Sequence, residues 1–197
     1  MDERLSKQLE FALEMDKEKS IGRQTYILKG ARKENDAEHA WHLSLMTLLL
    51  SEYSDETIDI ARTLALVTLH DVIEIDAGDT YAYDSKGNAT KREREVKAAD
   101  RIFSILPEDQ REYFRGLWDE FEEAKTPESK FAHSMDSIQP IMLNDASGGL
   151  AWREHGVFAP AVERRAQNTI RPGSEKLYRL AMEIIEKNVE KGNLKRD

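Results

Sequence analysis

The chain has 197 residues, no cysteine and a formal net charge of −9, which suits one soluble domain with a sizeable core and excludes thiolate catalysis and disulfide bonds. The acidic balance argues against binding to nucleic-acid polymers, whose affinity depends on cations that face phosphate. Because no apolar run approaches roughly 18 residues and the charged N-terminus lacks the apolar segment of a secretory signal, we expect a cytoplasmic protein without a membrane span.

Helical periodicity recurs along nearly the whole chain, and no segment shows sustained strand alternation. A first helix is expected around residues 5–16. Residues 21–34 lose the period, and we interpret them as a loop. Asn35 precedes Glu38 by three residues, which is typical of a capping box at a helix N-terminus. Apolar residues then follow every three or four positions, so we expect His39 in the first turn, on the face toward the core.

The next predicted helix begins near Asp55 and carries the pair His70-Asp71 close to its C-terminal end. Glu74 lies four residues after His70, so both side chains share one face if the helix continues. Residues 80–90 are expected to form a loop.

The string Thr126-Pro127-Glu128 combines an N-cap residue, a proline at the first helical position and an acid, which predicts a helix start. Asp136 lies in this helix beside an apolar stripe, and a glycine pair at 148–149 ends it. The remaining predicted helices cover residues 92–106, 107–125, 158–170 and 174–190. The fold class is therefore all-α.

Four residues of metal-ligand type lie on three of these helices: His39, His70, Asp71 and Asp136. Two imidazoles and two carboxylates suit a divalent transition metal, and helical bundles build such sites between facing helices. Burial of the two aspartates without a partner would be costly, and a metal would compensate them. Spacing alone does not decide between this site and separate structural roles, because His42 fits a ligand position equally well.

The order H…HD…D on helices resembles the signature of the HD-domain metal-dependent phosphohydrolases. Two longer strings are similar to the 5′-deoxynucleotidase branch of that superfamily: Arg-Lys-Glu-Asn-Asp-Ala-Glu-His at 32–39 and His-Asp-Val-Ile-Glu-Ile-Asp-Ala-Gly-Asp at 70–79. The run Gly-Gly-Leu-Ala-Trp-Arg-Glu-His-Gly at 148–156 is also similar. The resemblance extends over residues 5–190, and it implies a helical bundle with a mononuclear metal site.

This resemblance implies that His39, His70, Asp71 and Asp136 bind one divalent transition metal, which can be Mn, Co, Fe, Ni or Zn. Between Asp71 and Asp136 the sequence has a single histidine, His133, three residues before the last ligand. A second metal would lack nitrogen ligands, which argues against the dinuclear branches of the superfamily.

The resemblance also implies that Glu74 and Asp79 position water and transfer protons, and that Arg23 contacts phosphate. Members of the nucleotidase branch often have tryptophan directly after that arginine, where it can exclude a ribose 2′-hydroxyl. This chain has Gln24. A preference for deoxyribose is therefore not implied here.

Further candidates rest on residue type alone. Lys33 and Lys91 can add positive charge for a phosphate, and Trp41 can stack on a base, although a core position is the commoner role of tryptophan. We interpret His42 and His133 as structural. His155, in a glycine-flanked segment, is either pocket-lining or exposed.

We therefore expect hydrolysis of (deoxy)nucleoside 5′-monophosphates to nucleoside and phosphate. A single HD domain is expected over residues 1–197, with a core at about 20–145 and C-terminal helices at 158–190 packed on it. The resemblance suggests a homodimer, for which helices 5–16 and 174–190 can supply the interface.

Two alternatives stay open. The substrate can be another nucleotide phosphoester, a triphosphate or an alarmone, if folding brings Arg92, Arg94 or Arg153 to the site. The protein can also be a non-catalytic metal-binding module, in which case Glu74 and Asp79 are incidental.

Overall fold

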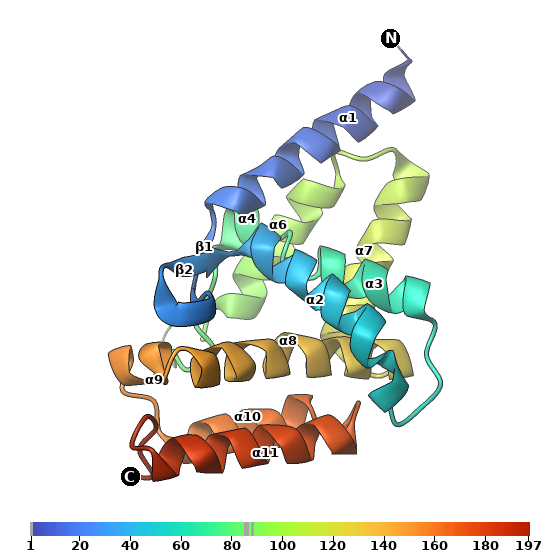
Figure 1. Cartoon of the computed structure of the whole chain (residues 1–197). Coiled ribbons are helices and arrows are strands. Elements are labelled where there is room, and N and C mark those ends of the chain that lie inside the picture. Colours follow the sequence, from blue (N-terminus) through green and yellow to red (C-terminus); the bar gives the residue numbers. More distant parts are fainter. Residues whose placement is uncertain (1, 85–86, 88) are drawn as a thin grey trace.

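A bundle of helices makes up most of the protein, as seen in a computed structural model that describes residues 2–84, 87 and 89–197 (Figure 1). The helices are α1 (Glu3–Met15), α2 (Asp36–Leu50), α3 (Ile60–Leu69), α4 (Glu74–Ala77), α6 (Lys91–Phe103), α7 (Glu108–Glu123), α8 (Pro127–Ala146), α9 (Leu150–Glu154), α10 (Ala159–Thr169) and α11 (Glu175–Glu190). Short 3₁₀ helices are η1 (Asp16–Ser20), η2 (Leu28–Gly30) and η3 (Ser51–Tyr53). The all-α prediction is confirmed.

Helix α8 is the central element, with α2, α3 and α7 against one side and α10 and α11 against the other (Figure 1). Thr126 caps its start, where the hydroxyl accepts the Ser129 N–H at 3.1 Å, and Pro127 follows as predicted. Phe131, Met135 and Ile138 are fully buried along it. A helix with partners on opposite sides brings residues from distant parts of the chain to the same place.

Residues 21–34 do not form the predicted loop. They fold into an antiparallel ribbon of β1 (Gly22–Tyr26) and β2 (Lys33–Asn35), in which Gly22 lies opposite Asn35. Lys29 and Gly30 turn the chain with φ angles of 66° and 70°. The prediction failed because strands of this length are too short to display a clear alternating pattern.

The predicted capping box at the start of α2 is confirmed. The Asn35 side chain accepts the Glu38 N–H at 2.9 Å, and the Glu38 carboxylate accepts the Asn35 N–H at 3.1 Å. These bonds fix the first turn of α2, in which His39 is completely buried.

The helix that precedes the His-Asp pair differs from the prediction at both ends. It begins at Ile60, capped by Asp59, rather than near residue 55. It ends at Leu69, and residues 70–73 form turns before α4 begins at Glu74. The Glu74 N–H donates to the Asp71 carbonyl at 2.8 Å, a bond that tightens the chain and stops the α-helix.

Several large apolar side chains lie outside the core. On α1 the side chains of Leu5, Leu9 and Leu13 are 46%, 47% and 74% exposed, while Phe11 is buried, because α1 extends beyond the body of the bundle (Figure 1). Met142 is 37% exposed rather than part of the core face of α8. Residues 85, 86 and 88 of the predicted loop lie outside the described residues. Among the described helices, none combines the length and apolar character that a membrane crossing requires.

Candidate metal centre

Three helices bring the four predicted ligands to one place. His39 Nε2, from α2, lies 3.2 Å from Asp136 Oδ1 of α8 and 4.0 Å from Asp71 Oδ2 at the end of α3. His70 Nε2 lies 3.0 Å from Asp71 Oδ2 and 3.8 Å from Asp136 Oδ1. Two imidazole nitrogens and two carboxylate oxygens therefore face a common point inside the bundle.

The tautomer of His70 shows that this set fits a metal. His70 Nδ1 lies 2.9 Å from the carbonyl oxygen of Val67, which only accepts, so Nδ1 carries the proton. In the neutral ring Nε2 is then a bare acceptor. It is buried and has no hydrogen-bond partner among the residues that the structure describes. A buried acceptor beside two carboxylates is completed by a cation, and an N₂O₂ set suits a divalent transition metal.

The charges of the site also require a cation between the two aspartates. Burial opposes a charge on His70, but Asp71 and Asp136 raise the pKa of its imidazole well above the ordinary value. Burial would also raise the pKa of Asp71, yet His70 and Arg23 lower it below the usual range. The two aspartates thus stay ionised and call for positive charge between them, which a protonated imidazole or a metal can supply.

Arg23 lies in the site rather than on the surface. From β1 its Nη1 donates to Asp71 Oδ2 at 2.6 Å and to Asp36 Oδ1 at 3.1 Å. Burial disfavours the charge, but the carboxylates of Asp71 and Glu74 raise its pKa well above the ordinary value. Arg23 therefore remains a cation that faces the metal ligands from the side of the ribbon.

Glu74 and Asp79 are the acidic pair expected to transfer protons. The Glu74 side chain is buried, and its Oε2 has no hydrogen-bond partner in the described part of the chain. Burial, then the charges of Asp71 and Asp36, raise the pKa of Glu74 well above its ordinary value. Burial also raises the pKa of Asp79, against the effect of Arg23. The pKa of each carboxyl is thus shifted upward, the direction in which a carboxylate becomes a stronger base and its acid form is more readily retained as a proton donor.

The sequence prediction missed Asp36, which is completely buried beside Arg23. Burial, together with the charge of Asp71, raises its pKa to about 7. Asp36 precedes His39 by three residues on α2, so helical spacing was a signal that could have placed it at the site.

A cavity of ≈ 100 Å³ opens beside the candidate ligands. Its lining includes Arg23, Gln24, Asp71, Glu74, Asp79, Tyr81, Tyr83, Lys91, Asp136, Ser137 and Arg165. Arg165 was not predicted. Its Nη2 donates from α10 to Asp136 Oδ2 at 3.2 Å, and no local pattern in the sequence indicates a contact between residues so far apart.

Gln24 and Lys33 differ in their relation to this cavity. Gln24 lines it, and its Oε1 accepts a hydrogen bond from Lys33 Nζ at 2.7 Å and lies 3.1 Å from His155 Nε2. Lys33 also donates to Glu154 Oε1 at 2.9 Å and is not part of the lining. Lys33 therefore orients Gln24 rather than reaching the cavity itself.

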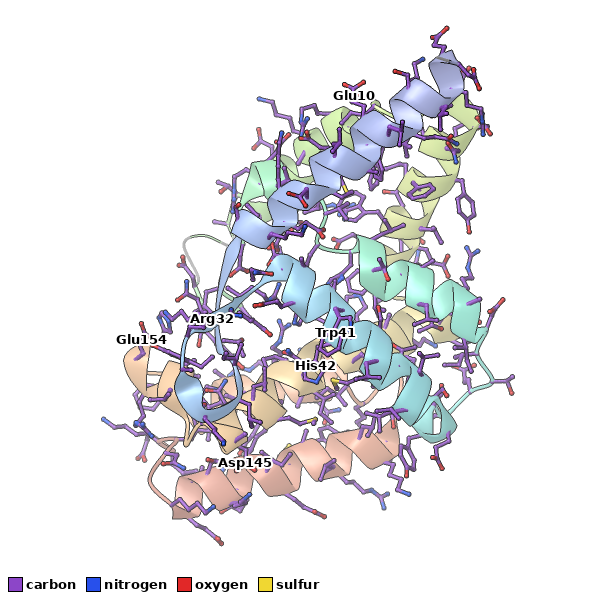
Figure 2. The ribbon with its side chains drawn as sticks, turned by 45° about the horizontal axis from the view of Figure 1, so that its top comes forward. Glu10, Arg32, Trp41, His42, Asp145 and Glu154 are labelled. Atoms are coloured by element: carbon purple, nitrogen blue, oxygen red, sulfur yellow. The ribbon has the colours of Figure 1, made fainter. Side chains whose placement is uncertain are left out.

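Trp41 is not brought to the cavity, and the alternative of a core position is wrong. Its side chain is 67% exposed on α2, next to His42 (Figure 2). Trp41 follows the buried His39 by two residues, and positions two apart on a helix point in different directions.

His42 and His133 do not join the four candidate ligands. His42 Nδ1 faces the Gln139 amide at 3.3 Å, and His133 Nε2 lies 2.8 Å from the Phe121 carbonyl. Both contacts are consistent with the structural roles predicted for these histidines.

Comparison with known proteins places the chain in context. A family model described as HD domain matches residues 15–178. The crystal structure of a predicted metal-dependent phosphohydrolase from Magnetospirillum magnetotacticum MS-1 is 41% identical, with a TM-score of 0.92 and coverage of 98% of each chain.

Named relatives are more distant. Human 5′-deoxynucleotidase HDDC2 is 29% identical over 111 residues, which cover 56% of this chain and 53% of the human protein. 5′-Deoxynucleotidase hdd1 of Schizosaccharomyces pombe is 28% identical over 128 residues, 62% of this chain and 63% of the yeast protein. The matched part thus spans less than two thirds of either relative.

Glu18, in η1, predicts a pH dependence of stability. Burial, then the charges of Asp71 and Asp36, raise its pKa from 4.5 to about 7. Between these pH values the unfolded chain binds fewer protons, so folded-state stability falls as pH rises. We expect Glu18→Gln to increase the free energy of unfolding at pH 8 by roughly 1–3 kcal/mol, with a gap that closes toward pH 4.5. Urea denaturation of metal-free protein measures both values; an equal gap at both pH values would contradict this origin.

Proposed function

The chain belongs to the HD domain family, and on that premise we propose that it is a metal-dependent phosphohydrolase that converts nucleoside 5′-monophosphates to nucleoside and phosphate. The observation that carries the proposal is the convergence of His39, His70, Asp71 and Asp136 around the unpartnered His70 Nε2. We propose these four as ligands of one divalent ion, Mn, Co, Fe, Ni or Zn. The names of the relatives support both the metal and the substrate class.

The proposed roles follow from the contacts. A bound metal supplies Lewis acidity toward a phosphoryl oxygen. Arg23 donates guanidinium N–H bonds to the phosphate. These bonds replace its bonds to Asp71 and Asp36. In the proposed reaction Glu74, whose pKa is raised by burial, donates a proton to the leaving 5′-oxygen, and Asp79, whose raised pKa makes it a stronger base, accepts one from the attacking water. Such proton transfer contributes about 10²–10⁴-fold to the rate.

The cations around the site favour a monophosphate over a triphosphate or an alarmone. Lys91 and Arg165 line the cavity, but the three arginines considered for longer phosphates do not. Arg92 donates to Glu122 at 2.8 Å, Arg94 to Thr80 at 2.8 Å, and Arg153 to the Gly148 carbonyl.

We also propose that residues 1–197 form a single domain, with a core at about 20–145 and C-terminal helices at 158–190. The packing of α10 and α11 on α8 supports this, as does the bond from Arg165 to Asp136.

Phosphate release from a panel of ribo- and deoxyribonucleoside 5′-monophosphates, with Mn²⁺ or Co²⁺ added to metal-stripped protein, tests the substrate class. We expect metal-dependent release from both sugar types, because the Gln24 carboxamide at the cavity can hydrogen-bond a 2′-hydroxyl. Gln24→Trp is expected to lower the ribo/deoxy ratio at least tenfold. If no nucleotide of the panel releases phosphate while the metal stays bound, another phosphoester substrate or a non-catalytic metal-binding module would be favoured instead.

Substitution of the proposed metal ligand Asp71 and of the proposed proton donor Glu74 is expected to have different effects. Asp71→Ala is expected to lose bound metal and turnover together, because it removes one of the four ligands. Glu74→Gln should keep the metal and lose about 10²–10⁴-fold in kcat. Metal content by elemental analysis and steady-state kinetics give the two readouts. Full turnover by Glu74→Gln would show that its catalytic role is wrong.

A homodimer through the outer side of α2 is the assembly that we propose. Trp41, Leu45, Leu48 and Leu49 recur at helical spacing there and are between 41% and 67% exposed. Monomeric proteins rarely expose large apolar patches, and a two-fold axis places such a patch against its own copy. Helices 5–16 and 174–190 were expected to supply the interface, but α11 packs against α8 and α10, and the exposed leucines of α1 lie on a helix that extends beyond the bundle (Figure 1).

Leu48→Glu is expected to convert the dimer to monomer, because it would bury two charges at the symmetric contact. Sedimentation velocity measures the mass. Leu28→Glu, a substitution at a 61% exposed position outside α2, serves as the control and should leave the dimer intact. A wild-type protein that sediments as a monomer at all concentrations would rule out this interface.

A further inference from the structure

Glu34 is a buried carboxylate that the proposed reaction does not use. It lies on β2 with 3% of its surface exposed. Its Oε1 is 3.4 Å from His39 Nδ1 and 3.6 Å from Arg23 Nε. Each of these three atoms is buried without a closer hydrogen-bond partner in the described residues. One acceptor thus faces two potential donors, His39 Nδ1 at 3.4 Å and Arg23 Nε at 3.6 Å.

The two histidines of the metal centre need the same tautomer, and they obtain it from different partners. Each presents Nε2 to Asp136 and Asp71, so each must carry its proton on Nδ1 to leave Nε2 free for a metal. For His70 the Val67 carbonyl accepts that proton. For His39 the group in the same position is the Glu34 carboxylate.

Glu34 is itself held in place by the helix that provides a ligand. Gln139 Nε2 donates to Glu34 Oε2 at 2.8 Å, which leaves Oε1 to face His39. Gln139 follows Asp136 by three residues on α8, so both side chains lie on the same side of that helix. The ribbon, α2 and α8 therefore meet in a chain that runs from Gln139 through Glu34 to His39.

We propose that Glu34 is a positioning residue of the metal centre, which accepts the Nδ1 proton of His39 and so fixes the tautomer and the ring orientation that present Nε2. A carboxylate that accepts the Nδ1 proton of a ligating imidazole also makes its Nε2 more basic toward the metal. Loss of such a carboxylate typically lowers metal affinity. This inference rests on the metal centre proposed above.

The test compares metal affinity and histidine tautomer in variants of the full chain. Co²⁺ titration followed by visible absorption gives the Kd, and ring ¹⁵N–¹H spectra of the Zn²⁺-loaded protein report the Nδ1 proton of His39. Glu34→Leu removes the acceptor, and we expect its Kd to rise roughly 10–100-fold with loss of the protected His39 signal. Glu120→Gln, which alters a carboxylate bonded to Arg62 and Thr126, is the control and should match the wild type.

A double variant separates positioning from folding. In Glu34→Gln/Gln139→Glu the donor and acceptor of the pair are exchanged, so the new amide donates to residue 139 and turns its oxygen toward His39. We expect this variant to bind Co²⁺ at least tenfold more tightly than Glu34→Leu and to retain the His39 Nδ1 proton.

The outcomes distinguish the role of Glu34 from the existence of the metal centre. If wild type and Glu34→Leu bind Co²⁺ with Kd values within threefold of each other and show the same His39 tautomer, Glu34 has no positioning role while the metal centre stands. If the wild type binds neither Co²⁺ nor Zn²⁺, the proposed function and the role of Glu34 are both wrong.

Discussion

The structure depends on one electrostatic constraint, the need for positive charge between two carboxylates that are largely removed from water. Asp71, from the turn after α3, and Asp136, from α8, reach the same point, each with a histidine nitrogen within 3.2 Å. Removed from water, ionised carboxylates are tolerated only when cations or donors surround them. Arg23 contributes from the ribbon and Arg165 from α10. Elements far apart in the chain are therefore held around this point.

Most of the centre could be predicted because its residues lie in segments with strong local signals. The capping box of Asn35 and Glu38 fixes where α2 begins, and hence the inward position of His39. The N-cap and proline that open α8 do the same for Asp136. Local signals of this kind act within a few residues, which is why they can be recognised without knowledge of the tertiary structure.

The rest could not be predicted, because it depends on contacts between distant segments. Arg165 is one of two adjacent arginines on α10, and only the packing of α10 on α8 directs it to Asp136. The position of Glu34 behind His39 arises from a ribbon too short to be recognised. Trp41 shows the converse, since an exposed apolar side chain on α2 cannot be distinguished from a core residue by periodicity when both sides of the helix are apolar.

The bond from Arg165 to Asp136 links the last helices to the reaction centre. Proteins open in cooperative units that differ in local stability. When α10 detaches from α8, the centre loses a cation while α2, α3 and α8 can stay folded. Under the proposed function, the fraction of molecules with a complete centre would then depend on the packing of α10 on α8 as well as on global unfolding. Heat or denaturant that detaches α10 would thus disturb the candidate metal centre while the rest of the bundle stays folded.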